Sequence, residues 1–311
     1  MKRREFVRTC AVGCGAALLP RVPLGRCDDQ LVERWSWAMG QPVHVMVFAT
    51  SQQQGLDACA AALAELRRVE TRLTLFDDTS DVCELNRHAG KRAMHLDRDL
   101  ERVLELADGF RQETNGGFNI AVEPLMRTWG FRTARSTEPT LTEIEAAREA
   151  VAAAVVTLEG NLARLPSAHT QIDLGGIGVG YGIDRALSVL RARRIRRAFL
   201  DVSGDCAALG TPPGEPGWRV DIADASVAGA IIATTHLRDA ALATSANTRS
   251  VVHYGRAVRG HVMNPATGWP AHARRQVTVV SRTAVAADAL STAMLVNERR
   301  TRGALQVYDV A

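Results

Sequence analysis

The chain has 311 residues, of which 46% are apolar, enough for a substantial core in one large domain or two closely packed ones. No stretch of the sequence reaches the roughly 20 apolar residues that a membrane span requires. The formal net charge is +4, but six basic residues and one acidic residue lie in the first 26 residues. The remainder has 32 basic and 33 acidic residues, a net charge of −1. We therefore do not expect a nucleic-acid-binding protein, whose surface would be basic.

The first 26 residues have the features of an export signal. Paired arginines in the segment Lys2-Arg3-Arg4-Glu5-Phe6-Val7 precede an apolar stretch, residues 11–20, that is too short and too rich in glycine to span a bilayer. This pattern is typical of the twin-arginine route, so we expect residues 1–26 to be a signal and residues 27–311 to form the mature, periplasmic protein. Arg26 precedes Cys27 where lipid attachment would need a small residue, so we do not expect a lipid anchor.

The spacing of apolar residues predicts both helices and paired strands. Helical spacing predicts helices over residues 54–73, 97–114, 179–193 and 284–296, and a further helix beginning at Thr140, where Glu143 has capping-box spacing. Strand patterns cover residues 42–50, 171–174, 198–202, 218–222, 231–237, 240–244 and 276–281, and a hairpin is expected over 155–165. Because strands and helices do not alternate strictly, we predict an α+β fold with mixed or antiparallel sheets and packed helices.

A glycine-dense segment between a predicted strand and a predicted helix is the first candidate for a ligand site. Asp173-Leu174-Gly175-Gly176-Ile177-Gly178-Val179-Gly180-Tyr181-Gly182 lets the backbone approach a ligand, and a helix N-terminus favours an anion such as a diphosphate. The spacing matches neither the dinucleotide fingerprint nor the phosphate-binding loop. A purely structural glycine turn is the alternative.

Two further segments carry polar residues suited to chemistry. Asp288 and Thr292 are four residues apart, so their oxygens lie on one face of an otherwise apolar helix and suit magnesium, although an exposed acid is the commoner explanation. His261, next to the Asn264-Pro265 turn, is a candidate general base, and a simple hydrogen-bonding role is the alternative.

Together with several other blocks, these segments resemble the ApbE family of FAD:protein FMN transferases over residues 37–296. The additional blocks are Met39-Gly40-Gln41, Glu70-Thr71-Arg72-Leu73-Thr74-Leu75-Phe76-Asp77, residues 114–125 with Trp129-Gly130-Phe131, Asp201-Val202-Ser203-Gly204-Asp205 and Ala243-Thr244-Ser245. Each block is short, and their shared order makes the resemblance specific.

The resemblance implies that FAD is the donor and that its FMN half is transferred in a magnesium-dependent step, with release of AMP. The acceptor that it implies is a serine or threonine in a Ser/Thr-Gly-Ala-Thr-like sequence of another flavoprotein. It implies Mg²⁺ ligands from Asp288, Thr292 and the backbone carbonyl of Gly178, and catalytic roles for Asp288 and His261. The flavin-binding residues that it implies are Met39, Phe76, Gly117, Phe118, Asn119, Gly175, Tyr181 and Val262.

The chain departs from the family pattern at several positions. Val179 stands where many members have a lysine, and Asn119 and Asn264 replace aspartates. Two other functions therefore stay open: an FAD pyrophosphatase that uses water as the nucleophile, and a non-catalytic flavin-binding accessory protein for the maturation of a periplasmic redox complex. The presence of Asp288 and Thr292 favours catalysis.

Overall fold

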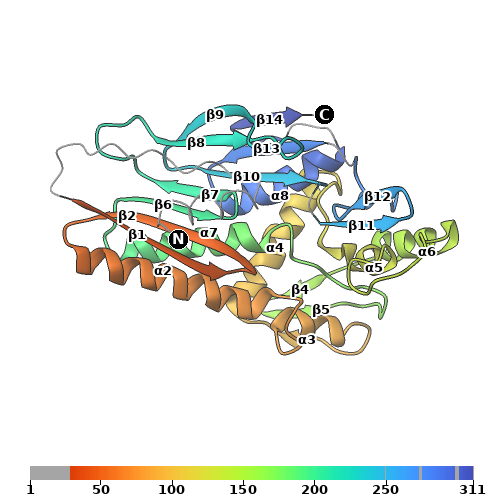
Figure 1. Cartoon of the computed structure of the whole chain (residues 1–311). Coiled ribbons are helices and arrows are strands. Elements are labelled where there is room, and N and C mark those ends of the chain that lie inside the picture. Colours follow the sequence, from red (N-terminus) through yellow and green to blue (C-terminus); the bar gives the residue numbers. More distant parts are fainter. Residues whose placement is uncertain (1–28, 249, 273–274, 298–300, 311) are drawn as a thin grey trace.

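A seven-stranded antiparallel sheet forms the centre of the molecule (Figure 1). The computed structural model describes residues 29–248, 250–272, 275–297 and 301–310, so the predicted export signal lies outside the described residues. In spatial order the strands are β1 (Gln30–Ala38), β2 (Gln41–Ala49), β6 (Arg197–Val202), β7 (Asp205–Leu209), β10 (Ala241–Ala246), β13 (Gln276–Ser281) and β14 (Gln306–Val310).

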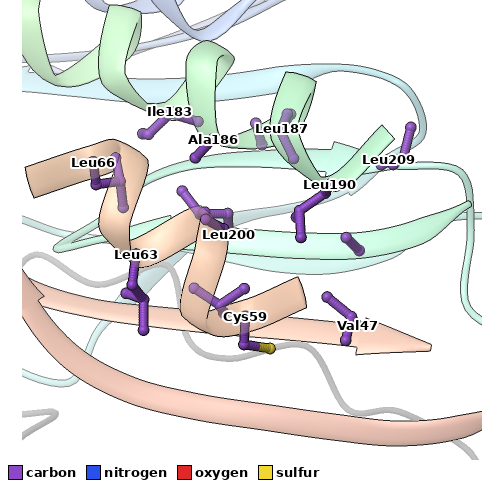
Figure 2. Packing of buried hydrophobic residues seen from close by; sticks show 14 of the residues in the cluster. Val47, Cys59, Leu63, Leu66, Ile183, Ala186, Leu187, Leu190, Leu200 and Leu209 are labelled. Atoms are coloured by element: carbon purple, nitrogen blue, oxygen red, sulfur yellow. The ribbon is translucent and has the colours of Figure 1, made fainter. Parts of the chain in front are cut away.

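Three helices cover one face of this sheet: α2 (Gln52–Leu73), α7 (Gly178–Ala192) and α8 (Ala284–Asn297). The apolar stripe of α2 has helical spacing, and its Cys59, Leu63 and Leu66 pack with Ile183 and other residues of α7 above the strands (Figure 2). Burial of these side chains fixes α2 and α7 against the sheet.

The opposite face is covered by the two-stranded sheet of β8 (Trp218–Ala223) and β9 (Ile231–Leu237). Trp218 is fully buried there, with its ring 5.5 Å from that of Phe199 and 6.0 Å from that of Phe48. The central strands are therefore buried on both faces, which explains why several of them are apolar nearly throughout.

Two smaller units extend the core at the ends of these layers. One contains α3 (Asp81–Arg87), β3 (Met94–His95), α4 (Arg98–Glu113), β4 (Thr157–Glu159) and β5 (Leu162–Arg164). The other contains η1 (Ile120–Val122), α5 (Glu123–Thr128), α6 (Leu141–Ala152), β11 (Val251–Tyr254) and β12 (Ala257–Gly260).

The predicted α+β class is confirmed, and the predicted helices form with boundaries close to those expected from the sequence. The capping box at the start of α6 is complete, with the Thr140 side chain accepting from the Glu143 backbone and the Glu143 side chain accepting from the Thr140 backbone. Of the described residues, no helix combines the length and apolar character needed to cross a membrane.

The strand predicted over residues 171–174 is wrong. The backbone of Ile172 instead makes two hydrogen bonds with the side chain of Asn86, one from its N–H to Oδ1 at 2.8 Å and one from Nδ2 to its carbonyl at 2.9 Å. The Asp173 N–H donates to the carbonyl of Ile120 at 2.7 Å. The segment is partly buried and belongs to no strand, and a side-chain amide satisfies groups that a neighbouring strand would have bonded.

Candidate functional site

A cleft of about 880 Å³ opens at one end of the central sheet. Two tight turns line it, Met39-Gly40 between β1 and β2 and Ser203-Gly204 between β6 and β7, and all four residues have positive φ. Two-residue hairpin turns of this kind match the twist of antiparallel strands, and they hold the backbone at the cleft in one conformation.

The glycine-dense segment lies against α8 at the level of the proposed metal ligands. Gly180 donates its backbone N–H to Asp288 Oδ2 at 2.9 Å, and a Cβ at position 180 would lie only 2.8 Å from the Asp288 Cβ. A Cβ at Gly176 would lie 3.3 Å from Thr292 Oγ1. Gly178, Asp288 and Thr292 all line the cleft, so the fold brings together the three residues of the proposed ligand set.

Asp288 is 6% exposed, and its burial raises the pKa of its carboxyl to about 7. The nearby Asp184 carboxylate raises this pKa further, while the hydrogen bond from Gly180 lowers it. Asp184 accepts hydrogen bonds from the N–H groups of Ala284 and Val285, both at 2.9 Å, and so caps α8 one turn before Asp288. A bound cation would offset the buried negative charge.

The donor set fits magnesium in its chemistry. Asp288 Oδ1 has no hydrogen-bond partner within the described residues, and the Thr292 hydroxyl and Gly178 carbonyl add two hard oxygen donors. No cluster of three or more His, Cys, Asp or Glu side chains suited to a metal occurs in the part of the chain that the structure describes. A cation here would therefore depend on one carboxylate, with the remaining positions open to substrate oxygens and water.

His261 also lines the cleft. Burial lowers its pKa, although the nearby Asp173 carboxylate and a hydrogen bond to the Ser250 backbone act in the other direction. Its Nδ1 is buried and has no hydrogen-bond partner in the described parts of the chain. The imidazole is therefore neutral near pH 7, with one ring nitrogen unused.

The residues implied for flavin binding lie around the same cleft, with one exception. Phe76 is 88% exposed at the rim, Phe118 is buried in the wall with its ring edge toward Phe110, and Asn119 caps η1 through its side chain. The implied residues that line the cleft are Met39, Phe76, Gly117, Phe118, Asn119, Gly175 and Val262.

Tyr181 does not line the cleft. It lies in the hydrophobic core at the start of α7, and its hydroxyl donates to Asp99 Oδ1 at 2.7 Å. Asp99 also accepts from Arg68, so the phenol is part of a polar network that joins α7, α4 and α2. The structure therefore places this residue in support of α7, away from the cavity.

Arg132 lines the cleft, although no sequence pattern indicated it as a site residue. Its guanidinium donates to Glu123 Oε2 at 2.8 Å and to Asp173 Oδ2, and it lies over the ring of Phe76 with Cζ 5.7 Å from the ring centroid. Arg132 thus joins α5, the glycine-dense segment and the loop that carries Phe76. No local motif marks it, because its partners come from three separated segments.

Asn247 is a second residue that the sequence did not indicate. It is 1% exposed and accepts from the Val262 N–H at 2.8 Å, while its Nδ2 donates to the carbonyls of Val262 and Ala271. A Cβ at Gly260 would lie within 2.5 Å of the Asn247 side chain, so glycine is needed there. Asn247 fixes the backbone on both sides of His261.

These features define the class of the protein: an antiparallel α+β fold with a cleft of about 880 Å³ that is lined by hard oxygen donors and a neutral histidine. Residues 39–307 match the ApbE family, and the chain belongs to that family.

Known relatives support this assignment over most of the chain. The FAD:protein FMN transferase of Treponema pallidum is 30% identical over 257 residues, covering 76% of this chain and 71% of the relative. That of Vibrio cholerae serotype O1 is 25% identical over 235 residues, covering 74% of this chain and 70% of the relative.

The crystal structure of an ApbE protein from Thermotoga maritima superimposes with a TM-score of 0.77 at 27% identity, covering 86% of this chain and 87% of that one. The apo flavinyl transferase ApbE of Pseudomonas stutzeri has the same fold, with a TM-score of 0.74 at 23% identity, covering 88% of this chain and 86% of that one.

Proposed function

We propose that this chain is an FAD:protein FMN transferase that uses Mg²⁺, takes FAD as donor and releases AMP. The observation that carries the proposal is the meeting of Gly178, Asp288 and Thr292 on one wall of a cleft that also contains His261 and the exposed ring of Phe76. The names of the relatives and the family membership support the same reaction.

In the proposed reaction the acceptor hydroxyl oxygen attacks the phosphorus on the FMN side of the FAD diphosphate. A new phosphoester bond forms, the bond to the bridging oxygen breaks, and AMP leaves with that oxygen. Bound Mg²⁺ would supply positive charge to the diphosphate as negative charge develops on the leaving group.

The chain's own residues hold the reactants and move the proton. The neutral His261, which lines the cleft, is our candidate for taking the proton from the acceptor hydroxyl. Asp288 serves as the cation ligand, a role that makes its carboxylate a weaker base. The proposed acceptor is a serine or threonine in a Ser/Thr-Gly-Ala-Thr-like sequence of a flavoprotein.

The decisive experiment incubates the chain without residues 1–26 with FAD, Mg²⁺ and a peptide bearing the acceptor sequence. We expect a peptide heavier by one FMN, with one AMP per transfer, and loss of both products in Asp288→Ala. Asp108→Ala is the matched control, because that carboxylate is half exposed on α4 and, among the described residues, pairs with its own helix neighbours Arg111 and Gln112.

The other two functions predict different products. Free FMN and AMP without labelled peptide, also lost in Asp288→Ala, would indicate the pyrophosphatase. FAD that binds tightly and stays intact would indicate the accessory protein. If either result is obtained again with the intact acceptor flavoprotein, the proposal that the chain is a transferase is wrong.

We also propose that the protein acts in the periplasm after export by the twin-arginine route. The paired arginines Arg3 and Arg4 support this location. Replacing both with lysine should leave the protein in the cytoplasmic fraction, whereas continued export of that variant would contradict the proposal.

A further inference from the structure

Three hydroxyl groups are linked in a row beside the proposed cation site, and two of them, those of Thr292 and Ser245, belong to residues that line the cleft. Thr292 Oγ1 lies 3.1 Å from Ser245 Oγ, and Ser245 Oγ lies 2.8 Å from Ser291 Oγ. The Ser291 hydroxyl then donates to the backbone carbonyl of Asp288 at 2.9 Å. Ser245 comes from β10 and the other residues from α8, so the chain of hydroxyls joins the central sheet to the helix that carries both side-chain ligands.

When all three hydrogen bonds between these hydroxyls and the Asp288 carbonyl form together, the number of protons fixes the direction of each bond. A hydroxyl has one proton to donate and two lone pairs to accept. Ser291 uses its proton on the Asp288 carbonyl, so between Ser291 and Ser245 the donor is Ser245. Ser245 has then used its own proton, so between Ser245 and Thr292 the donor is Thr292.

This direction matters because a hydroxyl binds a cation through its oxygen lone pairs, with its proton turned away. In this arrangement the Thr292 proton points to Ser245 on β10, which leaves the lone pairs of Oγ1 for the cleft. Ser291 is 1% exposed and does not line the cleft, so it acts on the site only through Ser245 and the helix backbone.

We propose that Ser291 and Ser245 are positioning residues that orient the Thr292 hydroxyl for cation binding, an inference that rests on the cation site of the proposed function. Without the Ser291 hydroxyl, the Ser245 proton is released and can be donated to Thr292. That reversal occupies a lone pair of Oγ1 and turns the Thr292 proton toward the cation. Groups that orient metal ligands in this way typically change metal affinity by about 10- to 100-fold.

The test measures cation affinity directly, using Mn²⁺ as the probe and the electron paramagnetic resonance signal of free Mn²⁺ as the readout, on the chain without residues 1–26. We expect Ser291→Ala and Ser245→Ala to raise the dissociation constant about tenfold, and Ser245→Thr, which keeps a hydroxyl, to stay within about twofold of wild type. Thr278→Val is the matched control, because the buried Thr278 hydroxyl, 2.8 Å from Thr244 Oγ1, lies on the same sheet, does not line the cleft and makes no hydrogen bond with Thr292 among the described residues.

The outcomes separate the inference from the proposed function. Wild-type Mn²⁺ affinity in Ser291→Ala, alongside lost binding in Asp288→Ala and Thr292→Ala, would overturn the positioning role and leave the cation site standing. Equal Mn²⁺ binding by wild type and Asp288→Ala would overturn both. Urea denaturation of each variant shows whether it is folded, and if Ser291→Ala is not, the comparison of Ser245→Ala with Ser245→Thr decides the question.

Discussion

Gly180 and Asp288 meet where α7 crosses α8, and the contact combines a hydrogen bond with an approach too close for any side chain. The Gly180 N–H donates to Asp288 Oδ2 at 2.9 Å, and a Cβ on Gly180 would lie 2.4 Å from the carbonyl oxygen of Ala284. That oxygen belongs to the backbone at the start of α8, so it cannot rotate out of the way. The glycine-dense segment therefore sets the distance between the two helices as well as the shape of the cleft.

Gly180→Ala should lower the free energy of unfolding by about 2–3 kcal/mol, because α7 and α8 must separate to admit a methyl group. Gly178→Ala is the matched control two residues earlier, where an added Cβ meets nothing within 4 Å. We expect that variant to be as stable as wild type or slightly more stable. Urea denaturation measures both, and equal stability of the two variants would contradict the packing argument.

Asp201→Asn should change stability in a pH-dependent way. Burial raises the pKa of the Asp201 carboxyl from 3.8 to about 6, whereas the hydrogen bond from the Gly204 N–H lowers it. The raised pKa means that the folded state loses stability as pH rises from about 4 to 6, and the loss persists above pH 6. His44 lies opposite in the pairing of β2 with β6, and its lowered pKa leaves it neutral at pH 8, so it does not offset the charge.

Asparagine keeps an acceptor for the Gly204 N–H but carries no charge. We therefore expect Asp201→Asn to be about 1–2 kcal/mol more stable than wild type at pH 8, with the difference near zero at pH 4. Thermal unfolding measured across this range tests the prediction. A difference that stays constant with pH would show that the carboxyl is not responsible.

Arg132→Met should destabilise the protein by about 3 kcal/mol, because it leaves the carboxylates of Glu123 and Asp173 without their shared guanidinium. Glu123 is 1% exposed, and its burial already raises its pKa. Arg127→Met removes the other partner of Glu123, but Arg127 is 59% exposed, so the loss should stay below about 1 kcal/mol. Similar losses in the two variants would show that Arg132 has no special role.

Phe76→Ala should weaken FAD binding about tenfold with little change in stability, because a ring that is 88% exposed contributes to ligand contact more than to the core. Quenching of flavin fluorescence measures the affinity. Leu141→Ala is the control, because Leu141 is 74% exposed at the start of α6 and does not line the cleft. Unchanged affinity in Phe76→Ala would remove this residue from the flavin site.

Much of the candidate site could be predicted from the sequence, because its residues lie in short segments whose order resembles one family. Asp288 and Thr292 share a face of α8 by helical periodicity alone, and both line the cleft. Tyr181 lies in an equally suggestive segment, yet the buried carboxylate of Asp99 binds its hydroxyl behind the cleft. Local sequence could not reveal this, because the two residues lie 82 positions apart.

What the sequence determined by itself is the local structure that depends on neighbouring residues: the capping box of Thr140 and Glu143, the amphipathic stripe of α2 and the glycine-dense start of α7. Tertiary structure alone decided what depends on residues far apart in the chain. The Asn86 side chain, instead of a neighbouring strand, bonds the backbone of Ile172, and the hydroxyls of Ser245 and Thr292 lie 3.1 Å apart across the sheet–helix interface. Periodicity arises from the geometry of a single element, whereas these contacts exist only once separate elements have packed together.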